Sequence, residues 1–299
     1  MAETQLLVLH PGRKQIIAMS TDGADIRVFL DGTDQVPDGI AVDQARGHLY
    51  WTNMGVPDRP GGDGYYTRNG SLERVDLDGT GRRTILPSGA FTTGKQLTAD
   101  FATGSLYWCD REGMRVLRAD LDGSRLEPLV VTATGDCAAQ VIENHCVGIA
   151  VDPVARQLYW TQKGAPKAGR GRILRAGLDI PVGQSATDRK DIEILWADLP
   201  EPIDLELAPD ASTLTWTDRG AEPEGNTLNR GRIHPGSTTP EILATGFRET
   251  IGLTTVDQRT YYVTDLHGGV YAVDSATSEK RLLADLGPGA TGIALAELG

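Results

Sequence analysis

The chain has 299 residues, of which 39% are hydrophobic, and its 29 Lys and Arg against 41 Asp and Glu give a formal net charge of −12. This acidic balance offers no surface that would neutralise phosphates, so we expect no nucleic-acid partner. The N-terminus has no basic segment followed by a long apolar run, and no stretch is long enough to span a membrane, so we expect neither a signal peptide nor membrane contact. Three cysteines without a CxxC pair favour free thiols and a cytoplasmic location.

The first predicted elements are three strands within residues 5–30. A longer unit then recurs, clearly at 39–53, 96–110 and 148–162 and in weaker form at 204–218 and 252–265. Its marker positions are Trp51, Trp108, Trp160, Trp216 and Val263, at spacings of 57, 52, 56 and 47 residues. After four of the copies, alternating apolar and polar residues around Asp-Gly or similar turns predict a second strand pair, at 71–86, 115–130, 172–179 and 269–284. Repeats of this kind predict a β-propeller built from four-stranded blades.

The two ends of the chain complete one further repeat. Residues 5–30 supply the last three strands of a unit, and residues 291–298 supply a first strand with nothing after it. Counted through the C-terminus, Val8 falls 44 residues after Val263, in register with the marker. We therefore predict one all-β domain over residues 1–299, a six-bladed propeller of four-stranded antiparallel blades whose last blade is closed by the N- and C-terminal strands.

The marker segments also carry a family resemblance. Tyr50-Trp51-Thr52, Tyr107-Trp108-Cys109-Asp110 and Tyr159-Trp160-Thr161, with weaker copies at 215–218 and 262–265, resemble the YWTD repeats of low-density-lipoprotein-receptor-type propellers. The resemblance covers essentially the whole chain and suggests a stand-alone, bacterial-type member. It implies the six-bladed fold, with Tyr and Trp packed between blades. Because receptor members of the family bind proteins, it also implies an alternative function as a non-catalytic interaction module with a protein partner.

Four long connections fall on one face of such a ring. They are residues 53–70, 131–146, 162–171 and 218–231. Enlarged loops on a rigid scaffold are typical of a binding mouth, although tolerated drift in loop length is the other interpretation. Aromatic walls for an organic ligand are expected from Tyr65, Tyr66 and Phe91, with Tyr65-Tyr66 as a lid.

Three polar residues interrupt the small residues that alternation places in the central channel. They are Gln96, Asp204 and Glu206, at positions that are Gly, Ala or Thr in other repeats. Two carboxylates this close raise one pKa, which predicts an acid/base pair or a cation site. Five further residues stand just outside, one near each of five blade entrances: Asp38, Lys95, His145, Glu201 and Glu249.

The leading interpretation is an enzyme that acts on a small molecule at a polar site in the channel mouth. The chain has no GxSxG, HExxH or P-loop sequence, so hydrolase, lyase and isomerase or cyclase reactions all stay open, as does the substrate. The predicted catalytic residues are Asp204, Glu206 and His145. The predicted substrate-binding residues are Gln96, Asp38, Lys95, Glu249, Tyr65 and Tyr66. A Ca²⁺ or Mg²⁺ ion would bind to Asp204, Glu206 and Glu201. The competing interpretations are a water-filled channel and a rim for a protein partner.

Overall fold

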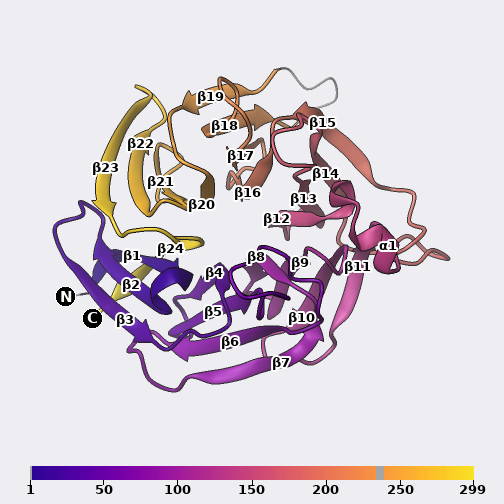
Figure 1. The fold of residues 1–299 in the computed structure, drawn as a ribbon, viewed down its shortest axis with the longest axis horizontal. Helices are drawn as coiled ribbons and strands as arrows, with labels where there is room; N and C mark the ends of the chain where they lie inside the picture. The colour runs from indigo at the N-terminus through magenta and orange to yellow at the C-terminus, as the bar shows by residue number, and fades with distance from the viewer. Residues whose placement is uncertain (1, 234–238) are drawn as a thin grey trace.

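Short strands with alternating apolar and polar residues pair with their neighbours in the chain and form six four-stranded antiparallel sheets. The computed structural model describes residues 2–233 and 239–299. The sheets surround a central axis as the blades of a propeller, with the first strand of each blade innermost (Figure 1). The predicted all-β, six-bladed architecture is confirmed.

The first three blades follow the chain from residue 37. Blade 1 consists of β4 (Pro37–Asp43), β5 (His48–Asn53), β6 (Gly70–Asp76) and β7 (Arg83–Phe91). Blade 2 consists of β8 (Gly94–Asp100), β9 (Ser105–Asp110), β10 (Arg115–Asp120) and β11 (Glu127–Val131). Blade 3 consists of β12 (Cys146–Asp152), β13 (Gln157–Gln162), β14 (Gly171–Gly177) and β15 (Glu193–Leu199).

The remaining blades complete the ring. Blade 4 consists of β16 (Pro202–Leu207), β17 (Thr213–Asp218), β18 (Thr227–Arg232) and β19 (Glu241–Ala244). Blade 5 consists of β20 (Thr250–Thr255), β21 (Thr260–Asp265), β22 (Gly269–Asp274) and β23 (Glu279–Asp285). Blade 6 consists of β24 (Ile293–Leu298), β1 (Glu3–His10), β2 (Gln15–Ser20) and β3 (Ile26–Asp31).

The helical segments are short and lie in connections. They are η1 (Pro11–Arg13), α1 (Asp136–Ala139) and η2 (Ile142–Asn144). In the part of the chain that the structure describes, none of the helices has the length and apolar character needed to cross a bilayer.

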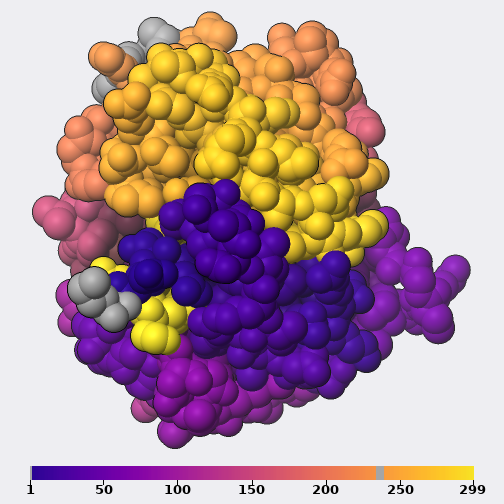
Figure 2. Space-filling view, turned by 90° about the vertical axis from the view of Figure 1, so that its left-hand side faces the viewer, coloured from indigo at the N-terminus to yellow at the C-terminus, as the bar shows by residue number. Residues whose placement is uncertain are grey.

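Blade 6 joins the two ends of the chain, as predicted. β24 pairs with β1 in antiparallel register from Glu3 opposite Leu298 to Val8 opposite Ile293. In the space-filling view the indigo N-terminal and yellow C-terminal segments adjoin (Figure 2). This pairing closes the ring without any covalent link.

The marker aromatic residues pack between blades. Trp51, Trp108, Trp160 and Trp216 are each at most 1% exposed. Trp51, for example, shares an apolar cluster with Leu7 and Ala294 of blade 6. The predicted core role of the motif is confirmed.

In blades 1, 3, 4 and 5 a threonine follows the marker residue and links the blade to the next one. In blade 3, Thr161 Oγ1 accepts the Gly148 N–H at 2.7 Å and donates to the Ile203 carbonyl of blade 4 at 2.9 Å. The strand bulges at Gly148, where an added Cβ would meet the Ile203 oxygen at 1.9 Å. Thr52 makes the same pair of bonds, accepting the Gly39 N–H and donating to the Lys95 carbonyl. Glycine is therefore required here by the backbone of the adjacent blade.

Deleting Thr291–Gly299 tests the closure. The deletion removes β24 and exposes the apolar faces that Ile293 and Leu298, 4% and 3% exposed, cover. Burying one such side chain is worth about 1.5–3 kcal/mol, so we expect the melting temperature to fall by at least about 10 °C, or folding to be lost. Thermal unfolding followed by circular dichroism measures this, with deletion of Gly299 alone as the control. A truncated protein that melts within a few degrees of the parent would show that the closure is dispensable.

Candidate functional site

A cavity of about 620 Å³, here called the mouth cavity, opens where the loops before the first strands meet the loops between the second and third strands. Three of the four long connections contribute to its wall, through Tyr65 and Tyr66, through Ile142 and His145, and through Pro166. The fourth, residues 218–231, contributes Arg219. The binding mouth predicted from loop length is therefore present as a cavity of a size suited to a small organic molecule.

Three cations line the mouth cavity from consecutive blades. Arg111, Lys163 and Arg219 each stand three residues after the marker tryptophan of blades 2, 3 and 4. The same position is apolar in the other blades, where it is occupied by Met54, Leu266 and Pro11. These cations were not among the predicted site residues, although their fixed spacing from the marker residue is visible in the sequence.

Lys95 and Asp38 form part of the cavity floor. Lys95 Nζ lies 2.5 Å from Asp38 Oδ1, and the two residues are 6% and 1% exposed. Burial lowers the pKa of the Lys95 ammonium, which Asp38 partly offsets. Asp38 Oδ2 has no hydrogen-bond partner among the described residues. The pair brings together two residues that were predicted to bind substrate, and it leaves one carboxylate oxygen without a partner.

An apolar cluster completes the floor. Val147, Ile203 and Ile251 occupy the same position in blades 3, 4 and 5 as Asp38 and Lys95 do in blades 1 and 2, and they pack against one another. The floor divides the space along the axis into two cavities.

Glu201 lies behind the cations. Its Oε1 is 2.9 Å from Lys163 Nζ and 2.8 Å from Arg219 Nε. Burial acts to raise the pKa of Glu201, but these two cations outweigh it and the pKa is lowered. Glu201 is therefore ionised. It pairs with Lys163 and Arg219, which line the mouth cavity, without lining the cavity itself.

Glu249, predicted to bind substrate, does not line the mouth cavity directly. Its carboxylate lies 3.4 Å from Lys167 Nζ and 3.9 Å from Arg219 Nε. It belongs to the same ion-pair network as Glu201 and acts on the cavity through Arg219.

His145 presents one unprotonated nitrogen. Its Nε2 lies 2.7 Å from the Ala139 carbonyl oxygen. Because a carbonyl only accepts hydrogen bonds, Nε2 carries the hydrogen and Nδ1 is left as an acceptor. Burial lowers the pKa of His145, which is 3% exposed and lines the mouth cavity, so the ring is neutral at pH 7.

Asp204, Glu206 and Gln96 lie below the floor, in a second cavity of about 180 Å³, here called the channel cavity. Among the described residues, the two cavities share no lining side chain. The structure therefore separates these three residues from His145, Asp38, Lys95, Tyr65 and Tyr66, which the sequence analysis had placed in one site.

The two channel carboxylates are held differently. Asp204 accepts backbone N–H groups from Leu205 at 2.9 Å and from Leu253 of blade 5 at 3.1 Å. Glu206 has no hydrogen bond or ion pair to any residue of the described segments. Burial raises the pKa of Glu206 to about 7, and it raises that of Asp204 well above its ordinary range. Asp204 is thus a link between blades 4 and 5, whereas Glu206 is unengaged.

The predicted metal ligands do not gather. Glu201 is on the mouth side of the floor and paired with two cations, whereas Asp204 and Glu206 line the channel cavity. In residues 2–233 and 239–299 no group of three or more His, Cys, Asp or Glu is placed to hold a metal ion. The calcium or magnesium site stays a prediction.

The aromatic residues divide between the mouth and the core. Tyr65 is 8% exposed and Tyr66 is 38% exposed, and both line the mouth cavity. Phe91, expected in the same wall, is fully buried instead and packs against Trp108 with ring centroids 5.3 Å apart. Its expected position was wrong because β7 extends to Phe91, whose side chain packs between blades 1 and 2.

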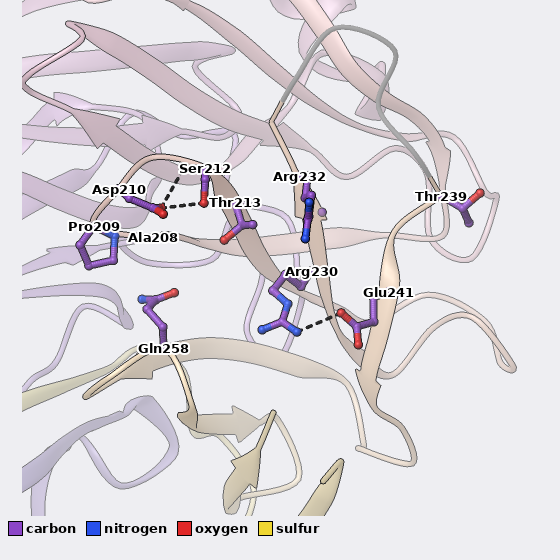
Figure 3. Close-up of a pocket in the computed structure, with 11 residues that line it drawn as sticks. Ala208, Pro209, Asp210, Ser212, Thr213, Arg230, Arg232, Thr239, Glu241 and Gln258 are labelled. Atoms are coloured by element: carbon purple, nitrogen blue, oxygen red, sulfur yellow. Dashed lines mark hydrogen bonds and ion pairs between the residues drawn. The ribbon is translucent and has the colours of Figure 1, made fainter. Parts of the chain in front are cut away.

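A separate surface pocket of about 600 Å³ lies between blades 4 and 5 (Figure 3). Its polar contacts are local, such as Arg230 to Glu241 at 3.0 Å and Ser212 to Asp210 at 2.7 Å. None of the predicted site residues lines it.

Known proteins with similar sequences support the family resemblance of the YWTD repeat. The chain is 44% identical to a Pyricularia oryzae protein named low-density lipoprotein receptor-related protein 1, over 94% of this chain and 92% of that one. The chain belongs to the low-density-lipoprotein-receptor-related family of YWTD-repeat propellers. It is also 40% identical to a Cochliobolus heterostrophus protein named 3-hydroxyacyl-CoA dehydrogenase-like protein LAM1, covering 94% of this chain but only 60% of that one. No protein-family model matches this YWTD propeller.

Two solved structures share the propeller fold at low sequence identity. A chain of a nidogen/laminin complex superposes with a TM-score of 0.76 and 22% identity, covering 98% of each chain. A Xanthomonas campestris gluconolactonase superposes with a TM-score of 0.59 and 16% identity, covering 98% of this chain and 89% of that one. At these identities the likeness concerns the fold alone.

Replacing Glu206 with alanine tests its unengaged state. The folded protein binds the Glu206 proton more tightly than the unfolded chain, whose pKa is near 4.5, so the carboxylate costs stability as the pH rises from about 4.5 to 7. We expect Glu206→Ala to match the parent near pH 4.5 and to exceed its unfolding free energy by roughly 1 to 3 kcal/mol at pH 8. Urea unfolding at several pH values measures this, with Glu206→Gln as the isosteric control. A loss of stability at pH 8 would identify Glu206 as a structural residue.

Proposed function

We propose that the mouth cavity binds a small organic molecule through a carboxylate or carbonyl group and catalyses an acid/base reaction of the hydrolase, lyase or isomerase class. The observation that carries the proposal is that Lys95, Arg111, Lys163 and Arg219 converge on one cavity beside a neutral histidine. Glu201 lies behind two of these cations, so they are held in place and still face a ligand. Fixed positive groups in a partly buried cavity favour a substrate on which negative charge develops.

The residues divide the chemistry between them. His145 Nδ1 is the candidate general base, because the Ala139 carbonyl fixes its tautomer and burial keeps it neutral. Lys95 is the candidate proton donor. Its lowered pKa lies closer to neutral pH than that of an exposed lysine, and its ammonium donates a hydrogen bond to Asp38. Arg111, Lys163 and Arg219 would stabilise the negative charge of the transition state. The fold that this chain shares with a gluconolactonase supports an enzyme that acts on a small molecule.

The second candidate function is a non-catalytic protein-binding module. The nidogen/laminin structure and the receptor-related name of the Pyricularia oryzae relative favour it. Such a module needs an exposed aromatic patch across several blades. Among the large apolar side chains that are exposed in the described segments, Tyr66 is the only aromatic one, whereas charged side chains are buried around the mouth cavity. We therefore place the protein-binding function second.

Several expectations stay predictions. They are the catalytic roles of Asp204 and Glu206, the substrate-binding role of Gln96, the cytoplasmic location, and the lack of nucleic-acid and membrane partners. The proposal does not depend on any of them, because the residues that carry it lie above the floor.

Butyrate, a small carboxylate, tests binding. We expect it to raise the melting temperature of the wild type, and Arg219→Met to weaken its binding at least about tenfold, since a charge-assisted contact is worth about 1.5–3 kcal/mol. Arg230→Met is the matched control, because Arg230 lines the separate pocket between blades 4 and 5. Equal binding to the wild type and Arg219→Met, or none to either, would contradict the proposal.

His145→Gln tests catalysis. A screen of simple lactones and esters first identifies a compound that the wild type turns over. We expect His145→Gln to lower kcat on that compound about 10²- to 10⁴-fold, the range of a lost general base, while butyrate binding is kept. Turnover that survives the substitution would remove His145 from the reaction. A wild type that binds butyrate and turns over no compound of these classes would support binding without catalysis.

A further inference from the structure

Another cavity, distinct from the channel cavity, adjoins the mouth cavity on the same face. It has a volume of about 780 Å³ and is here called the side groove. It runs between the long β5–β6 loop, the start of β10 and the connection that contains α1, which Figure 1 shows beside β11 at the outer part of the ring. Tyr66 and Glu112 line both cavities. The two cavities therefore meet at these two residues.

Glu112 stands at the junction with half of its carboxylate unused. Its Oε1 accepts hydrogen bonds from Arg111, from Nε at 2.7 Å and from a terminal guanidinium nitrogen at 2.6 Å. Its Oε2 is buried and has no partner among the described residues, and the residue as a whole is 5% exposed. A buried carboxylate oxygen without a donor is costly, so a ligand that supplies one would be bound favourably.

Arg115, on the same hairpin, has a hydrogen-bond donor without a partner among the described residues, whereas Glu112 has an unpartnered acceptor. It lines the side groove, and one of its terminal nitrogens lies 2.5 Å from Asp110 Oδ2. Its Nε is buried and finds no acceptor in the part of the chain that the structure describes. One acceptor and one donor without partners therefore belong to side chains that line the same groove, three positions apart in the sequence.

From these observations we propose that the substrate is elongated: its carboxylate or carbonyl end occupies the mouth cavity, and an uncharged hydrogen-bonding arm, carrying an amide or a hydroxyl, lies in the side groove. The proposal rests on the proposed function, because it takes the mouth cavity as the reaction site. Amides and hydroxyls each supply both a donor for Glu112 and an acceptor for Arg115. Met114, Pro128 and Val131 also line the side groove and can contact the apolar part of the arm.

Four probes separate the parts of this proposal. Butyrate occupies the mouth cavity alone. N-acetyl-6-aminohexanoate adds an arm with an amide, 8-hydroxyoctanoate adds an arm with a hydroxyl, and nonanoate adds an apolar arm of similar length. We expect the amide or the hydroxyl probe to bind at least tenfold more tightly than butyrate and more tightly than nonanoate. Isothermal titration calorimetry measures the four affinities.

Two variants locate the arm. Ala133→Trp fills the side groove, and Val141→Trp is the matched control, since Val141 is exposed on the same connection and lines neither cavity. We expect Ala133→Trp to reduce the gain from the arm to less than threefold and to leave butyrate binding unchanged. Val141→Trp should keep the full gain.

The native cysteines allow a direct readout. Cys137 is exposed and lies between Asp136 and Ala139, which line the side groove, whereas Cys109 and Cys146 are buried. We expect the fluorine chemical shift of a trifluoromethyl tag on Cys137 to change when the armed probes are added and to stay the same when butyrate is added.

The outcomes are distinguishable. If butyrate binds and no arm adds affinity, the elongated substrate is wrong and the proposed function stands. If nonanoate binds as tightly as the amide and hydroxyl probes, the groove is apolar and the hydrogen-bonding arm is wrong. If the armed probes keep their gain in affinity over butyrate in Ala133→Trp, the arm binds outside the side groove and the proposal is wrong. If butyrate does not bind, the proposed function and this inference fall together.

Discussion

The hydroxyl that bridges adjacent blades is the interaction on which the ring depends. In blades 1, 3, 4 and 5 the motif threonine donates to a carbonyl of the next blade, that of Lys95, Ile203, Ile251 or Thr291. Cys109 makes the weaker equivalent in blade 2, with Sγ 3.3 Å from the Gly148 oxygen. Blade 6 has Leu9 at this position, and Thr291 Oγ1 instead donates to the Pro37 carbonyl at 2.9 Å. Because these bonds lie next to the axis, they set how closely the blades approach.

The same motif positions the mouth. The aspartate that follows the threonine accepts backbone N–H groups from the loop before the first strand, as Asp218 does from Glu201 at 3.0 Å. Glu201 in turn holds Lys163 and Arg219. Asp218, a residue of the motif that fixes the loop backbone, thus helps to orient a carboxylate that pairs with two cations. This series of hydrogen bonds and ion pairs explains how charged side chains stay ordered on loops, where backbone hydrogen bonds are otherwise few.

Buried charge at the mouth has an energetic cost that the packing of the blades offsets. Lys95 and Asp38 are almost fully buried, and such a pair contributes little net stability once desolvation is included. Asp38, Glu112 and Gln96 each keep a buried polar atom without a partner among the described residues. Unsatisfied polar groups that line cavities are typical of sites where function has been favoured over stability.

The sequence by itself determined the fold, because a period of about fifty residues, alternation within strands and the Tyr-Trp-Thr segments all describe local pairing that each blade repeats. It also located the mouth and named Lys95, Asp38, His145, Tyr65 and Tyr66 near it. Only the tertiary structure decided that a floor separates these residues from Asp204, Glu206 and Gln96. Alternation along a strand predicts which face a side chain is on, but it does not show which side chains of different blades pack together near the axis. The pairing of Glu201 with Lys163 and Arg219, and the burial of Phe91, likewise depend on contacts between blades that no single repeat contains.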